Sequence, residues 1–195
     1  MGGTISKAMT QYPFRRGPLA IELASTIFAV DGQVRDGLTT PADLAAWLNI
    51  NHLHVPRASD ASQLDRFRAL RNAVRELLAA AVEGHSPAPS AVALLNDRSA
   101  AAPQWTRLDW VDRTGHRTAV EVADDALTVA LAMVARSCID VLGDPERERL
   151  GRCRAPGCVL FFFKARGRRE WCSARCGNRA RVARHYQRHH VRADR

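Results

Sequence analysis

Apolar residues recur every three or four positions along much of the chain, and this spacing predicts amphipathic helices. The longest pattern predicts a helix capped by Ser59 or Asp60, whose side chains can accept a hydrogen bond from the first turn. Its apolar stripe consists of Leu64, Phe67, Leu70, Val74, Leu77, Leu78 and Ala81. On this helix Arg68 and Arg75 fall on the opposite face, and Arg71 falls near the edge of the stripe.

A second strong stripe predicts a helix that is capped by Asp124 and broken at Gly143, Asp144 and Pro145. Its apolar positions are Leu127, Leu131, Val134, Cys138 and Val141. Because Cys138 lies on this buried stripe, we expect it to be a small core residue and not a metal ligand.

Weaker patterns predict three further helices. The first covers residues 18–31 and ends at Gly32. The second starts with Thr40 as its cap and Pro41 at its first helical position. Proline is tolerated there because the N–H at that position has no hydrogen-bond partner within the helix. The third is Ala-rich and covers residues 90–101.

Residues 105–122 change to an alternating pattern around a Gly-containing turn, which predicts a β-hairpin. The expected fold is therefore mainly α. Residues 1–150 form a helical domain with one β-hairpin, and residues 151–195 form a second, smaller module. We place the boundary at residues 150–151 because net charge and cysteine content change together there.

Four of the five cysteines fall within twenty-four residues near the C-terminus, as a Cys-x4-Cys pair and a Cys-x3-Cys pair. They are Cys153, Cys158, Cys172 and Cys176. Two close pairs predict a tetrahedral zinc site, and a redox dithiol is the weaker alternative. Four thiolates leave no position for water, so we expect one structural Zn²⁺ per chain. Three histidines are rival ligands: His185, His189 and His190.

The second module has a recognisable order of elements. Pro156 and Gly157 suit a tight knuckle between the first two cysteines. A strand over residues 159–163, a turn and a returning strand over residues 170–171 should follow. The last two cysteines then share one helical turn, which Ser173 can cap. Knuckle, hairpin and helix in this order resemble a treble-clef zinc finger.

Charge is distributed unevenly between the two parts. Residues 151–195 hold 13 Lys+Arg and 2 Asp+Glu, a net charge of +11, whereas residues 1–150 hold 16 and 18, a net charge of −2. This asymmetry indicates a polyanionic partner, and nucleic acid is the usual one. Arg181, Arg184, Arg188 and Arg192 share one face of the predicted last helix, flanked by Arg175 and Arg179.

This face is suited to phosphate contacts, and Arg or Asn side chains can hydrogen-bond base edges in a major groove. The candidate nucleic-acid-binding residues are Asn178, Arg179, Arg181, Arg184 and Arg188. On a second stripe, Val182 and Tyr186 are expected to pack on aromatic residues of the hairpin. A solvated basic face with no specific partner is the alternative.

Two motifs carry a family resemblance. Trp171-Cys172-Ser173 and the tetrapeptide Cys176-Gly177-Asn178-Arg179, together with the first cysteine pair, resemble the CGNR zinc finger. Residues 40–48 and residues 19–26 are similar to helices of the ABATE domain, which precedes this finger in bacterial proteins described as stress-induced transcription regulators. The resemblance implies DNA binding by the finger and a sensing role for the helical domain.

We therefore expect a DNA-binding transcription regulator whose residues 1–150 bind a small-molecule effector or a second copy of the chain. Two alternatives remain: an RNA-binding module in which Trp171 and Tyr186 stack on bases, and an adaptor that binds an acidic protein partner. An enzyme is not expected, because the sequence offers no nucleophile–base pair at telling spacing, no Gly-rich phosphate loop and no open metal site.

No apolar run approaches the ~18 to 20 residues of a membrane span. The N-terminus lacks a basic region followed by an apolar region, so we expect no secretory signal. We expect no membrane partner and a cytoplasmic, nucleoid-associated protein.

Overall fold

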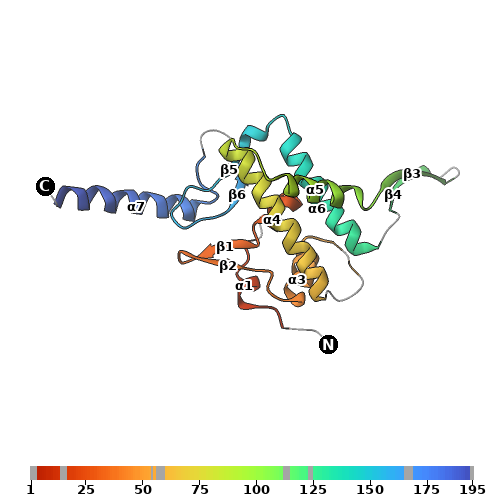
Figure 1. The fold of residues 1–195 in the computed structure, drawn as a ribbon, viewed down its shortest axis with the longest axis horizontal. Coiled ribbons are helices and arrows are strands. Elements are labelled where there is room, and N and C mark those ends of the chain that lie inside the picture. The colour runs from red at the N-terminus through yellow and green to blue at the C-terminus, as the bar shows by residue number, and fades with distance from the viewer. Residues whose placement is uncertain are drawn as a thin grey trace.

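Two helices form the centre of the fold, α4 (Ala61–Glu83) and α6 (Ala126–Gly143). The computed structural model of the chain describes residues 4–13, 17–53, 55, 60–111, 115–122, 125–164 and 169–193. Within it, α2 (Leu19–Ala24) and α5 (Pro89–Ala100) each pack against both central helices. Figure 1 shows α4 crossing the body diagonally, with α5 and α6 beside it.

The long stripe on α4 is confirmed. Asp60 caps the helix by accepting a hydrogen bond from the backbone N–H of Gln63, whose side chain bonds back to the cap. The stripe residues that are buried are Leu64, Phe67, Leu70, Val74, Leu77 and Leu78. Ala81 is exposed instead. Trp47 of α3 (Pro41–Ile50) is fully buried, with its ring centroid 5.9 Å from that of Phe67.

Residues 18–31 do not form one helix, so this prediction was wrong. Helix α2 ends at Ala24, and β1 (Ile27–Val30) pairs antiparallel with β2 (Gln33–Asp36). The two-residue turn is Asp31-Gly32, with φ of 50° and 80°. An Asp-Gly pair tolerates such positive φ values, and the resulting turn matches the twist of a hairpin. The chain before residue 100 thus contains a second hairpin that the helical periodicity concealed.

A buried ion pair fixes this hairpin to the central helix. Both terminal nitrogens of Arg71 on α4 donate to the Asp36 carboxylate, at 2.6 and 2.9 Å, and one also donates to the Thr26 hydroxyl at 3.3 Å. The Arg71 side chain is almost completely buried. A buried guanidinium requires a charged partner. Arg71, at the predicted edge of the α4 stripe, therefore attaches the β1–β2 hairpin to α4.

The buried carboxylate of Asp43 organises the start of the chain. The capping box of α3 is confirmed: Thr40 accepts from the backbone N–H of Asp43, and Asp43 accepts from that of Thr40. Asp43 also accepts from the backbone N–H of Ser6 at 2.7 Å, just before α1 (Lys7–Thr10), and from Thr39. Burial raises the pKa of the Asp43 carboxyl, but these hydrogen bonds outweigh burial and lower the pKa below its ordinary value.

The helix predicted after Asp124 is α6, but its cap is Asp125, which accepts from the backbone N–H groups of Leu127 and Thr128. Asp124 lies outside the described residues. Cys138 is fully buried, as predicted, and burial raises the pKa of its thiol to about 12. In length and apolar composition α6 matches a membrane span, contrary to expectation. Its apolar face nevertheless packs against α2, α4 and α5, as in the core helix of a folded domain.

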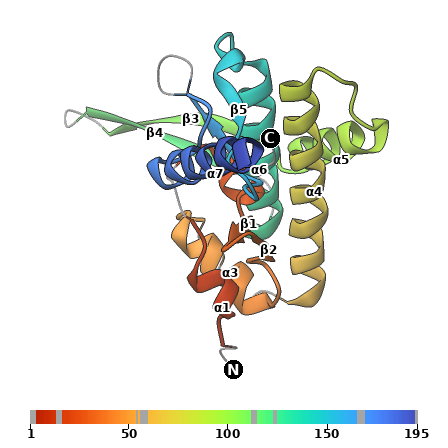
Figure 2. The same ribbon diagram turned by 90° about the vertical axis from the view of Figure 1, so that its left-hand side faces the viewer.

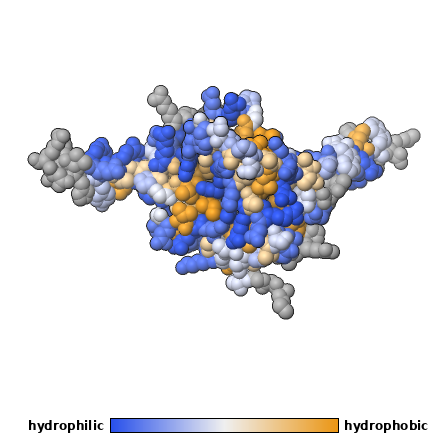
Figure 3. Space-filling model, viewed as in Figure 1, coloured by the Kyte–Doolittle hydropathy of each residue, from blue (hydrophilic) through white to orange (hydrophobic). Residues whose placement is uncertain are grey.

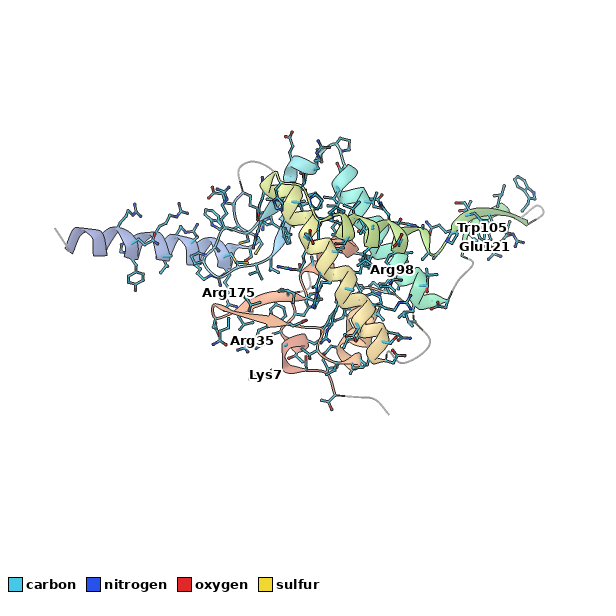
Figure 4. The ribbon with its side chains drawn as sticks, viewed as in Figure 1. Lys7, Arg35, Arg98, Trp105, Glu121 and Arg175 are labelled. Carbon is cyan, nitrogen blue, oxygen red and sulfur yellow. The ribbon has the colours of Figure 1, made fainter. Side chains whose placement is uncertain are left out.

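The predicted hairpin is confirmed as β3 (Gln104–Val111) and β4 (Gly115–Val122), paired antiparallel in one continuous register. It projects from the body at the end opposite α7 (Figure 1). Figure 4 places Trp105 and Glu121 on this arm. Trp110 is 71% exposed, so the arm adds little to the core.

The C-terminal module consists of η2 (Arg147–Arg149), β5 (Leu150–Arg152), β6 (Phe161–Phe163) and α7 (Ala174–Ala193). The mainly α fold with a small hairpin-and-helix finger is confirmed. The strand pairing differs from the expected one, because β6 pairs with β5 and not with residues 170–171. Strand β5 includes residues on both sides of the predicted domain boundary, which stays a prediction.

Candidate metal centre and basic helix

The four cysteine sulfurs converge on one point. Cys153 directly follows β5, Cys158 precedes β6, Cys172 lies just before α7 and Cys176 lies in its first turn. All four sulfurs lie within 4.8 Å of one another. The Cys172 sulfur is 3.8 Å from that of Cys158 and 3.5 Å from that of Cys176. The structure therefore brings together all four predicted ligands.

These spacings fit a zinc ion. Four sulfurs at about 2.3 Å from Zn²⁺ at the corners of a tetrahedron are about 3.8 Å apart. Thiolates are the soft ligands that zinc accepts, and four of them leave no position for water, so the site holds one structural Zn²⁺. His185 lies exposed on α7 and outside the sulfur cluster. The side chains of His189 and His190 lie outside the description.

The loop between the first two ligands folds as a tight knuckle. Gly157 adopts a φ of +71°, a conformation that favours glycine. The backbone N–H of Cys158 donates to the Ala155 carbonyl at 3.0 Å, and that of Cys153 donates to the Leu160 carbonyl at 2.9 Å. The Pro156-Gly157 prediction therefore holds, and the knuckle leads directly into β6.

The second ligand pair is anchored by the start of α7. The Ser173 hydroxyl accepts from the backbone N–H of Cys176 at 3.2 Å, as predicted for its cap. The backbone N–H of Cys172 donates to the Cys153 sulfur at 3.4 Å, and the Arg179 guanidinium donates to the Cys176 sulfur at 3.5 Å. Such donors stabilise the negative charge of thiolates and orient them around the ion.

The sulfurs also shift one another's pKa values. The pKa of Cys153 lies far below its ordinary value, because Cys158 and then Cys172 hydrogen-bond to its sulfur. The same interaction with Cys153 raises the pKa of Cys158. The cluster therefore favours a thiolate, which is the form that binds zinc, and zinc binding releases the remaining thiol protons.

The finger rests against the β1–β2 hairpin. Phe28 of β1 is 2% exposed and belongs to the same buried cluster as three of the cysteines. At the knuckle, a Cβ on Gly157 would lie 3.3 Å from the Cα of Gly32, so the two turns touch backbone to backbone. Arg175, which is labelled in Figure 4, forms an ion pair with Asp31 at 3.8 Å, but both side chains are exposed and the pair contributes little.

Arg75 of α4 joins the body to the finger. Its guanidinium donates to the Ala24 carbonyl at 2.7 Å and to the Val159 carbonyl at 3.2 Å. It also lies 5.5 Å from the centroid of the Phe161 ring. Burial, followed by repulsion from Arg71 and Arg152, lowers the pKa of Arg75 to about 10. The face opposite the apolar stripe thus contacts the finger.

Helix α7 starts on the body and extends away from it (Figures 1 and 2). Cys176, Gly177 and Ala180 are buried in its first turns. Beyond them Arg181, Arg184 and Arg188 are exposed and lie within an arc of about 60° on an ideal helix. Figure 3 shows a mostly hydrophilic surface along this described part of α7. The Arg192 side chain lies outside the description.

Comparison with protein families agrees with this arrangement. Residues 17–145 match ABATE, described as "Putative stress-induced transcription regulator". The protein belongs to the ABATE family. Residues 149–189 match the CGNR zinc finger, which follows the ABATE domain as the resemblance implied. A comparison with curated proteins finds no match.

The tetrapeptide that names the CGNR finger has mixed roles in this ABATE protein. A Cβ on Gly177 would lie 3.4 Å from the Trp171 ring, so glycine allows the indole to pack on the helix. Arg179 is half-buried against the Cys176 sulfur, whereas Asn178 is exposed and accepts a hydrogen bond from Arg181. Asn178 is therefore the more accessible of the two to an external partner, and the nucleic-acid contacts predicted for Asn178 and Arg179 stay predictions.

One expectation about the CGNR helix was wrong. Val182 and Tyr186 do not pack on the finger's aromatic residues but are 53% and 61% exposed. Helix α7 leaves the body after the buried Ala180, so these later positions face solvent. Trp171 is covered by Arg184 instead, whose guanidinium lies 5.4 Å from the ring centroid.

Sequence reasoning missed the ABATE residues that support the finger. The sequence did not indicate that Arg75 contacts the finger, since an arginine opposite an apolar stripe normally faces solvent. Phe28 was assigned to a helix, although the Asp31-Gly32 pair after it is a strong hairpin signal.

Proposed function

We propose that this ABATE-family protein is a DNA-binding transcription regulator in which the zinc finger presents α7 to the duplex. The observation that carries the proposal is the exposed row Arg181, Arg184 and Arg188 on a helix that extends away from the body. An α-helix fits the major groove of B-DNA, and exposed arginines on one face contact phosphates or guanine edges.

Zinc has a positioning role in this proposal. The metal fixes Cys172 and Cys176, and these residues set the direction in which α7 leaves the body. Chelation of zinc is therefore expected to abolish DNA binding, even though α7 contains its arginines unchanged.

Salt dependence tests the electrostatic part. Four exposed arginines of α7 are available for phosphate contacts: Arg175, Arg181, Arg184 and Arg188. Each neutralised phosphate contributes about −0.9 to the slope of log K against log salt, so four contacts predict a slope of about −4. Fluorescence anisotropy with a labelled duplex over a salt series measures the slope. An affinity that does not depend on salt contradicts the proposal.

A charge variant with a matched control locates the contacts. Arg181→Ala with Arg188→Ala should weaken duplex binding and reduce the slope by about 2. Arg107→Ala is the control, because Arg107 is exposed on β3 at the opposite end of the molecule. Equal losses in both variants would indicate nonspecific attraction and would overturn the assignment to α7.

RNA binding is a second candidate, which the exposure of Tyr186 and Val182 favours. An exposed aromatic ring beside arginines can stack on an exposed base of single-stranded RNA. Competition between duplex DNA and structured RNA for the same protein separates the two candidates. Tyr186→Ala should weaken RNA binding specifically if RNA is the partner.

Three further properties complete the proposal. The protein acts by binding and not by catalysis, since the four-sulfur site leaves no position for a substrate. Residues 1–150 bind an effector or a second copy of the chain, as the ABATE resemblance implies for a regulator. A regulator of transcription works on the chromosome, so we place its action in the bacterial cytoplasm at the nucleoid. Size-exclusion chromatography with light scattering tests the dimer.

A further inference from the structure

A cavity of about 750 Å³ lies where the helical body meets the finger. Its walls are the C-terminal end of α4, the segment from α6 through η2 to β5, and residues of the finger. These elements lie together in the upper half of the molecule in both ribbon views (Figures 1 and 2). The volume is in the range of small-molecule sites, which often occur where two structural units meet.

One side of this junction cavity is apolar. Leu77 of α4, Leu150 of β5 and Phe162 of β6 are 5–6% exposed and contribute to the lining, together with the half-buried Leu142 at the end of α6. Ala81 of α4, the one stripe residue that is exposed, also lines the cavity. An apolar group of a ligand could therefore displace water from this surface.

The other side is strongly cationic. Five cationic side chains line it, and Glu148 and Glu170 are the two carboxylates. The five are Arg147, Arg152, Arg154, Lys164 and Arg169. Of these, Arg152 is the one paired with a carboxylate among the described residues, that of Glu83 at 2.5 Å.

The remaining cations have no carboxylate partner among the described residues. Lys164 donates to the backbone carbonyl of Glu148 at 3.3 Å, and Arg169 donates to the carbonyls of Trp171 and Cys172 at 2.7 and 2.6 Å. Carbonyl oxygens orient these groups without neutralising them. Within the described part of the chain, the side chains of Arg147 and Arg154 have no hydrogen-bond or ion-pair partner.

Arg169 is held in place before any ligand arrives. Its two bonds to carbonyls fix the guanidinium plane, which lies 5.5 Å from the centroid of the Phe162 ring. A cation with so little freedom loses little entropy when it binds an anion. Arg154 stands next to the zinc ligand Cys153, and its backbone N–H donates to the Glu170 carbonyl at 3.1 Å.

We propose that the junction cavity binds a small amphipathic anion, an aromatic or aliphatic acid whose apolar part lies on Leu77, Leu142 and Phe162. Its carboxylate, sulfonate or phosphate group then lies among Arg147, Arg154 and Arg169. An apolar surface combined with several cations that have no carboxylate partner selects this class over neutral or cationic molecules. The binding stands independently of the function proposed for α7, because the row of arginines on α7 is not part of the cavity.

The position of the site suggests a use for such a ligand. Arg169 donates to the carbonyls of Trp171 and of the metal ligand Cys172, so the guanidinium that holds the anion also contacts the backbone of the metal centre. An anion that shifts this guanidinium can change the position of Cys172 and Cys176 and so the stability of the zinc site. This regulatory step, unlike the binding itself, rests on the function proposed for the finger.

Titration calorimetry on the full-length, zinc-loaded protein tests the binding. The probes are 2-naphthoate, octanoate and phenyl phosphate, with neutral 2-naphthamide as the matched uncharged ligand. We expect saturable binding of at least one anion to one site per chain, and binding of the amide at least about tenfold weaker. If none of the three anions saturates the protein at millimolar concentration, the proposal is overturned.

Two variants locate the site by different means. Arg147→Gln with Arg154→Gln should weaken the anion about tenfold or more by removing charge, since neither side chain supports the fold through a described contact. Ala81→Trp should block the cavity sterically while every charge remains. Arg188→Gln on α7 and Arg107→Gln on β3 are controls that should bind the anion normally. Circular dichroism and zinc content confirm that each variant is folded.

A competing explanation has a distinct result. If the cavity arginines are additional DNA phosphate contacts, the Arg147/Arg154 variant loses duplex affinity while the wild-type protein binds no anionic probe. That outcome overturns the proposal, as does anion binding that neither the charge variant nor the steric variant reduces. Loss of DNA binding in the α7 variants alone would bear on the function of the finger and not on this cavity.

Discussion

The helical body and the finger are stabilised in different ways. The body buries a continuous apolar core built around α4 and α6. The finger's buried cluster is small, three of its members are metal ligands, and Phe28 is contributed by the body. A module of about 45 residues is near the size below which a core alone rarely suffices. The finger therefore relies on its metal site and on the body for burial, and it contributes Leu150 of β5 and Phe161 of β6 to the core of the body in return.

The largest effect should come from removing one zinc ligand. Cys172→Ser is expected to release zinc and disorder residues 151–193, because a structural site supplies about 10 kcal/mol. The helical signal of the body should remain in circular dichroism, and elemental analysis measures the zinc.

Cys138→Ala is the matched control for this change. Cys138 is equally buried but lies in the body on α6, so its replacement should leave the zinc content at one ion per chain. Loss of all helical signal in Cys172→Ser would show that the two parts fold as one unit.

A second comparison contrasts two tryptophans in the helical part. Trp47 is fully buried against Phe67, so Trp47→Ala should destabilise the body by about 3–5 kcal/mol through loss of burial and creation of a cavity. Trp110 is mostly exposed on β3, so Trp110→Ala should change the free energy of unfolding by no more than about 0.5 kcal/mol. Urea denaturation measures both, and equal effects would contradict the assignment of the core.

A third effect should depend on pH and concern the body. The pKa of Asp43 is lowered in the folded protein, so its hydrogen bonds stabilise the fold fully above the ordinary pKa of about 4. That contribution is lost as the pH falls through the lowered, folded-state pKa. Asp43→Asn should destabilise the body by about 2 kcal/mol at pH 7 and by much less near pH 2.

Asp65→Asn is the control for this pH series. The Asp65 side chain is 74% exposed and pairs with Arg68 at 3.4 Å, so its loss should have a small effect at every pH. A difference between Asp43→Asn and wild type that stays constant from pH 7 to pH 2 would rule out a charged Asp43 as the cause.

The smallest effect should test the contact between the two parts. Gly157→Ala places a Cβ at a φ of +71° and 3.3 Å from the Cα of Gly32, which should cost about 1–2 kcal/mol. The cost should appear in the finger, as faster transfer of zinc to a competing chelator. Gly143→Ala is the control, because a Cβ there meets nothing within 4 Å. Identical zinc transfer in the two variants would show that the knuckle does not rest on the hairpin.

The parts that local chemistry specifies could be predicted from the sequence. Thr40 and Pro41 mark the start of α3, and Asp60 caps α4, because a cap needs only its own first turn. The four ligands followed from their spacing for the same reason, since sulfurs a few residues apart can reach one ion.

The parts that depend on distant residues could not be predicted. Strand β6 pairs with residues that precede the first cysteine, and the β1–β2 hairpin is held by an arginine 35 positions away, Arg71 to Asp36. The apolar spacing between Leu19 and Val30 suits a helix equally well, so periodicity alone could not decide. The junction cavity combines residues from Leu77 to Glu170, which are separated by nearly half of the sequence.

The most direct test of the central claim is hydrogen exchange, followed by mass spectrometry, on the full chain with and without a zinc chelator. The account predicts that chelation removes amide protection from β5, β6 and the start of α7 and leaves the protection of α4 and α6 unchanged. Protection of the finger that survives complete removal of zinc, or loss of protection in α4 and α6 together with the finger, would contradict it.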